Sequence, residues 1–169
     1  MKIIAVLVMQ GIPPRDFPQY EVAELFTLST RLKYTYGVER EALEKRHTEL
    51  DKKIRNWPRT EHNDPLIASS HQLSTLLKQT TNYEVIVAYN EYCSPSVDEA
   101  LDLAVRSGAD KIVVIPMSMV SVGGQLEVDI AKAIEHAQSW RIGIPITCAW
   151  PFDISEVIQL IKKHINRFA

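Results

Sequence analysis

The stretch Ile3-Ile4-Ala5-Val6-Leu7-Val8-Met9, followed by Gln10-Gly11, decides the fold. An unbroken apolar run rich in β-branched residues is typical of a strand covered on both faces, and therefore of a parallel sheet. The run is short for a secretory leader, and the segment that follows it does not resemble a small-residue cleavage site. We therefore expect it to form a buried first strand.

Three further apolar runs predict strands, at Tyr83–Tyr89, Lys111–Met117 and Pro145–Trp150. More than seventy residues separate the first two strands, and a structureless loop of that length is uncommon in a compact domain. We therefore expect three helices in this link, at about Tyr20–Tyr34, Glu39–Asn56 and Leu66–Gln79.

Helix signals also fill the later gaps between strands. One helix is expected to open at Ser94, with its serine as N-cap, and a second to span Leu126–Ser139. A last helix is expected to start at Asp153, with four residues facing inward: Val157, Ile158, Ile161 and Ile165.

The resulting order predicts one α/β domain over residues 1–169, a doubly wound four-stranded parallel sheet with a helical insertion at about 31–65. Right-handed crossovers favour the strand order 2-1-3-4. This order places the C-terminal ends of the first and third strands side by side, at the switch point where ligands bind in such sheets. Gln10 and Gln125 are both expected to lie there.

Composition excludes several classes of protein. A net charge of -2 and a pI near 6.2 argue against a nucleic-acid partner. No apolar stretch is long enough to span a bilayer. Cys93 and Cys148 are expected about 14 Å apart in this sheet, too far for a disulfide. Two free thiols predict a reducing, cytoplasmic location.

Common α/β chemistries are also missing. The chain has no dinucleotide fingerprint, no Walker A sequence and no nucleophile elbow. Asp16 lies too far beyond the first strand for a receiver-type acidic pocket. The remaining polar groups at the strand ends include Gln10, Glu91 and Gln125.

A set of motifs covers nearly the whole chain, in segments 11–18, 55–60, 63–65, 90–101, 116–119, 123–130 and 149–153. By these motifs the chain resembles the single-domain sirohydrochlorin chelatases of the CbiX type, which are class II chelatases.

The resemblance implies a site that inserts a divalent metal, such as Co²⁺, Ni²⁺ or Fe²⁺, into a tetrapyrrole. The family places its metal-binding and catalytic histidines at the positions that hold Gln10 and Gln125 here. A glutamine amide is a weak ligand and no useful base, whereas imidazole is both ligand and base. If chelation persists, Glu91 is expected to accept the proton, with Gln10, Gln125 and Glu91 as metal contacts.

Other residues are predicted to hold the ring. Sirohydrochlorin carries eight carboxylates, and arginine suits carboxylate binding. Arg15 and Arg59 are favoured for this role because they lie in family-like motifs, whereas a solvated helix face is the alternative for the basic segment. Met117 and Met119 are expected either to line a flat apolar ring site or to pack in the core. Among the histidines, only His62 is a candidate replacement ligand.

The predicted function is that of a chelatase relative that binds a sirohydrochlorin-type ring, with chelation altered or lost. The alternative is a non-catalytic tetrapyrrole or metal binder, or a partner subunit of an active chelatase. The resemblance also implies a homodimer.

Overall fold

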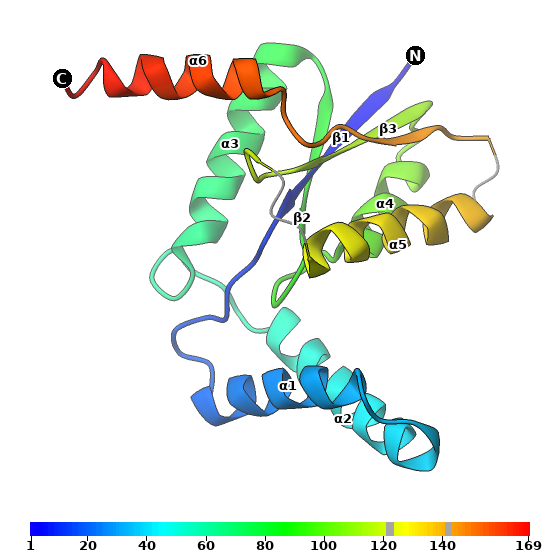
Figure 1. Cartoon of the computed structure of the whole chain (residues 1–169). Coiled ribbons are helices and arrows are strands. Elements are labelled where there is room, and N and C mark those ends of the chain that lie inside the picture. Colours follow the sequence, from blue (N-terminus) through cyan, green and yellow to red (C-terminus); the bar gives the residue numbers. More distant parts are fainter. Residues whose placement is uncertain (121–123, 141–142) are drawn as a thin grey trace.

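The computed structural model describes residues 1–120, 124–140 and 143–169, without the side chains of Gln125 and Trp140. Its strands are β1 (Ile3–Met9), β2 (Glu84–Tyr89), β3 (Lys111–Pro116) and β4 (Ile146–Cys148). Its helices are α1 (Gln19–Leu32), α2 (Gly37–Arg55), α3 (Pro65–Thr81), α4 (Val97–Arg106), α5 (Gln125–Trp140) and α6 (Ile154–Ile165). Figure 1 shows the whole chain.

The sheet confirms the predicted α/β topology. Four parallel strands lie in the order β2-β1-β3-β4, with Val8 of β1 opposite Ala88 on one side and Pro116 on the other. Because β1 is central and its neighbours run parallel to it, the C-terminal ends of β1, β2 and β3 lie along one edge. This edge is the one that the sequence predicted to carry the site.

Alternate residues of β1 face two separate hydrophobic clusters. Ile4, Val6 and Val8 point to the face covered by α4 and α5, where they pack in one core with residues such as Leu101 and Ile130. The intervening residues of β1 belong to a second cluster that α3 covers. The strand is therefore buried on both faces, as its continuous apolarity predicted.

Helices α1 and α2 form an antiparallel pair that we call the helical hairpin (residues 19–55). It lies beyond the C-terminal ends of β1 and β2, apart from the sheet (Figure 1). The hairpin has its own small core, built from Leu25, Leu28, Leu50 and Ile54 together with Phe17 of the preceding loop. Ion pairs also join its two helices, including Lys53 to Glu21 at 2.7 Å and Arg46 to Glu24 at 2.7 Å.

Two local predictions are corrected. The N-cap of α4 is Ser96, not Ser94: the Ser96 hydroxyl accepts from the Glu99 amide and the Glu99 carboxylate accepts from the Ser96 amide, a capping box. In α6 only Val157 is buried, while Ile158, Ile161 and Ile165 are 54%, 47% and 58% exposed. The prediction that these three isoleucines face inward is wrong, because α6 projects away from the sheet instead of covering it (Figure 1).

Within the described residues, no helix combines the length and apolarity needed to cross a membrane.

Candidate functional site

The strand-end site begins where β1 and β2 stop. Backbone pairing continues past both strands, since the Asn90 amide donates to the Met9 carbonyl (2.8 Å) and the Glu91 amide to the Gln10 carbonyl (3.0 Å). The Gln10 side chain donates from Nε2 to Oε2 of Glu91 at 2.9 Å. The structure thus brings together two of the predicted site residues as an amide–carboxylate pair.

Gly11 allows this close approach. Its φ is +80°, a left-handed conformation that favours glycine. A Cβ at this position would lie 1.9 Å from the backbone oxygen of Glu91. Position 11 therefore has room only for glycine while the two strand ends are paired.

Gln125 is placed only by its backbone, at the first residue of α5. This helix follows β3, the neighbour of β1 in the sheet. The Gln125 side chain lies outside the described residues, so its predicted proximity to Gln10 stays a prediction.

Arg59 lies beneath the site and is bound to protein groups. Its side chain is 8% exposed and pairs at 2.7 Å with Asp64, which is fully buried. Its guanidinium also donates to the backbone carbonyls of Ile12, Ile54 and Tyr92. Arg59 thus joins the loop after β1, the end of α2 and the loop after β2. Its predicted contact with a ligand carboxylate stays a prediction: the two terminal nitrogens are bound to these partners, and the buried Nε has no hydrogen-bond partner among the described residues.

Arg55 holds the same loop from the end of α2. It donates to the Cys93 carbonyl (2.6 Å) and the Asn90 carbonyl (3.1 Å), and it pairs with Asp51 (2.8 Å). Its contacts with this loop could not be predicted from the sequence, since these partners are backbone atoms at least thirty-five residues away along the chain. The hairpin is therefore anchored directly to the residues that flank Glu91.

The other predicted ring contacts lie at the surface. Arg15 is exposed. Met117 and Met119 follow β3 and are 41% and 51% exposed, which excludes core packing for both. Their contact with a flat ring stays a prediction. His62 is exposed and does not line the cavity described below.

Two titratable groups near the site have pKa values that their surroundings shift. The Asn63 amide, with Trp57, donates to the Asp16 carboxylate and holds its pKa below the usual 3.8. Cys93 is 1% exposed, and burial raises the pKa of its thiol above the usual 9.0. A buried neutral thiol is a poor metal ligand. In the described part of the chain, histidine, cysteine and carboxylate side chains form no group of three suited to a metal ion.

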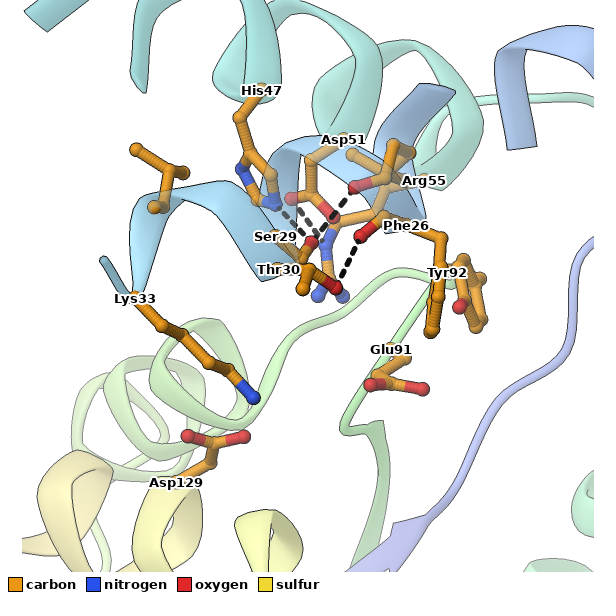
Figure 2. A pocket seen from close by; sticks show the side chains of 12 residues that line it. Phe26, Ser29, Thr30, Lys33, His47, Asp51, Arg55, Glu91, Tyr92 and Asp129 are labelled. Carbon is orange, nitrogen blue, oxygen red and sulfur yellow. Dashed lines mark hydrogen bonds and ion pairs between the residues drawn. The ribbon is translucent and has the colours of Figure 1, made fainter. Parts of the chain in front are cut away.

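A cavity of about 440 Å³ lies between the helical hairpin and the loop after β2, which we call the strand-end loop (residues 90–96). Figure 2 shows its walls. The hairpin contributes Leu25, Phe26, Ser29, Thr30, Leu32, Lys33, His47, Asp51 and Arg55, and the other wall carries Glu91, Tyr92 and Asp129. Glu91 was predicted from the sequence, whereas the residues of α1 that line the cavity were not, because helical periodicity does not show which side of a helix faces a cavity.

Comparisons with known proteins give the chain a family. The family model described as CbiX matches residues 62–167, more than half of the chain. A curated sirohydrochlorin cobaltochelatase from Methanopyrus kandleri is 31% identical over 70 residues, which cover 41% of this chain and 48% of the relative. The chain thus matches about half the length of that relative.

A solved structure shows the same fold. It is described as a putative cobalamin (vitamin B12) biosynthesis CbiX protein from Marinobacter aquaeolei VT8. The two structures superpose with a TM-score of 0.52 over 98% of each chain, at 14% sequence identity. The parallel sheet and the extent of the family match lead to one conclusion: this chain belongs to the CbiX family.

Proposed function

We propose that this protein binds a sirohydrochlorin-type tetrapyrrole at the strand-end site, and that its metal insertion is slowed or lost. Support for the ring comes from the family and from the name of the Methanopyrus relative. The metal is a substrate here, with Co²⁺ as the first candidate by that relative's name and Ni²⁺ and Fe²⁺ as chemically similar ones.

The hydrogen bond from Gln10 to Glu91 carries the proposal. Metal insertion requires delivery of a partly dehydrated cation and removal of two pyrrole protons. An amide accepts no proton near neutral pH, and this amide donates to the carboxylate that would have to serve as the base. The pair is therefore suited to ordering the site and poorly suited to chelation.

The same bond favours a second function, that of a non-catalytic tetrapyrrole or metal binder or of a partner subunit for an active chelatase. The two functions share ring binding and differ in turnover. A spectroscopic assay with sirohydrochlorin and Co²⁺, compared with the uncatalysed rate, separates them. Saturable ring binding without acceleration favours the binder.

The variant Gln10→His with Gln125→His is expected to raise the rate of Co²⁺ insertion at least tenfold, since one imidazole base typically contributes a factor of about 10²–10⁴. The rate is measured from the visible spectrum of the metallated ring. Gln72→His with Gln79→His, two exposed positions on α3, is the matched control and is expected to leave the rate unchanged. An unchanged rate in the site variant would contradict the proposal that these positions are the inherited metal site.

We also propose that the protein is a homodimer in which α6 contacts a second copy. Its exposed apolar residues follow helical spacing: Ile154, Ile158, Ile161 and Ile165. An isolated helix of this length is marginal in water, and an exposed apolar stripe marks an interaction surface. A second copy presents the same stripe, which is what a two-fold interface requires. A cytoplasmic location stays a prediction from the two free cysteines.

A further inference from the structure

We propose that the helical hairpin forms the second wall of the ring site, where Phe26 stacks on the conjugated ring and Lys33 binds one of its peripheral carboxylates. This inference rests on the proposed function, because it assigns contacts to the same ligand. It concerns residues 19–55, which lie outside the segment matched by the family model.

The cavity beside the hairpin has two facing walls. Its volume of about 440 Å³ is within the range of small-molecule sites. One wall carries Glu91, and the facing wall is the hairpin. Arg55 fixes the spacing of the walls, since it lines the cavity from α2 and donates to the carbonyls on either side of Glu91 and Tyr92. A ligand that reaches Glu91 from this cavity therefore contacts the hairpin.

Phe26 presents an exposed aromatic ring at this cavity. Its neighbours Leu25 and Leu28 are buried in the hairpin core, whereas Phe26 lines the cavity with 69% of its surface exposed. Tyr92 lines the same cavity from the strand-end loop, with its φ at +59° and its phenol pKa raised by burial. An exposed aromatic ring and a neutral phenol at one cavity suit a flat, conjugated ligand.

Lys33 brings a positive charge to the cavity. It follows the last residue of α1, and its ammonium group points across the cavity toward Asp129 on α5 (Figure 2). Arg55 is committed to Asp51 and to backbone carbonyls, so Lys33 is the better placed hairpin cation for an incoming anion. Aromatic surface beside a cation matches a tetrapyrrole with acidic substituents at its edge.

The test uses two porphyrin probes, uroporphyrin with eight carboxylates and deuteroporphyrin with two, titrated into the full chain and followed by fluorescence. Phe26→Ala is expected to weaken binding of both probes about tenfold, because both present the same ring face. Lys33→Ala is expected to weaken uroporphyrin about threefold and deuteroporphyrin less, since only the former presents a carboxylate to Lys33 in every orientation of the ring.

Two controls come from the same hairpin. Tyr34→Ala removes an aromatic side chain that is 78% exposed and does not line the cavity, and Lys45→Ala removes an exposed charge on α2. Both are expected to bind as the unaltered protein does, and circular dichroism checks that all four variants fold.

The outcomes separate the two proposals. If the unaltered protein binds neither probe, the proposed function fails and the hairpin assignment fails with it. If the unaltered protein binds both probes, and Phe26→Ala and Lys33→Ala bind them as tightly as it does, the hairpin assignment is overturned while the proposed function stands. Losses as large in Tyr34→Ala and Lys45→Ala would also overturn the assignment.

Discussion

At the scale of single residues, the site is ordered by a layer of polar contacts beneath it. Arg59 and Asp64 form a nearly fully buried pair, and Cys93 lies against the same carboxylate, with its sulfur 3.6 Å from Oδ2 of Asp64. The pair fixes three chain segments that surround Glu91. Buried charges of this kind are costly unless they are paired, so removing one partner has a large effect.

Arg59→Ala is expected to lower the free energy of unfolding by about 3–5 kcal/mol, because it leaves Asp64 buried without its partner. Urea denaturation followed by circular dichroism measures the change. Arg46→Ala is the control: its pair with Glu24 is exposed on both sides, so the loss is expected to be only a small fraction of the loss in Arg59→Ala. Equal losses in the two variants would refute the structural role assigned to Arg59.

Residues differ in how far the sequence predicted their surroundings. Gln10 and Glu91 were expected at one edge because parallel strands end together, and they are in contact there. The partners of Arg59 and Arg55 could not be predicted, since most are backbone carbonyls whose positions depend on the path of irregular loops. Local patterns carry no information about such paths.

At the scale of helices and strands, the periodicity of the sequence predicted the positions of the elements well. It predicted less well which part of the molecule covers each element. The α6 pattern correctly predicted a helix with an N-cap at Asp153, whose carboxylate accepts from the Ser155 and Glu156 amides. The same pattern predicted the row of apolar residues along α6. The burial of that row was wrongly predicted, because an amphipathic pattern does not show whether the apolar face packs within its own chain or against another molecule.

Ile158→Lys with Ile161→Lys is expected to convert a dimer into a folded monomer, since it places two charges in the stripe on α6. Light scattering coupled to size-exclusion chromatography gives the mass in solution. Gln159→Lys adds a charge at an exposed polar position of the same helix and is expected to leave the dimer intact. If the unaltered protein is monomeric at every concentration tested, the α6 interface is refuted.

At the scale of the whole molecule, the chain consists of a sheet domain and a hairpin joined by polar contacts. The apolar runs predicted the sheet, its strand order and the helices of the long link. They did not predict that α1 and α2 would pack on each other away from the sheet, because their apolar positions are satisfied by a small core of their own. The carboxylates of Asp16, Glu21 and Glu24 also stabilise this arrangement, because each accepts a side-chain hydrogen bond.

Acid is expected to loosen the hairpin. Hydrogen bonds from Asn63, Lys53 and Arg46 lower the pKa values of Asp16, Glu21 and Glu24 from their usual 3.8, 4.5 and 4.5. Lowered pKa values mean that these contacts stabilise the fold fully above about pH 4.5, and that the stabilisation is lost as pH falls through the folded-state values.

The measurement is thermal unfolding between pH 6 and pH 2, followed by tryptophan fluorescence, since Trp57 lies beside Asp16. Glu21→Gln with Glu24→Gln is expected to be less stable at pH 6 and to lose less on acidification. A pH profile of the same steepness in the variant would show that these two carboxylates do not control the acid response.

The glycine at position 11 also makes this chain suitable for protein engineering. With the Glu91 carbonyl so close that no Cβ fits, the two segments are locked in register, and whatever is grafted at position 10 has a fixed backbone offset from position 91. Pairs such as cysteine with aspartate, or a coordinating unnatural amino acid with glutamate, can be exchanged there without redesigning the backbone. The natural Gln10–Glu91 pair is then one member of a series that can be built and compared on the same scaffold.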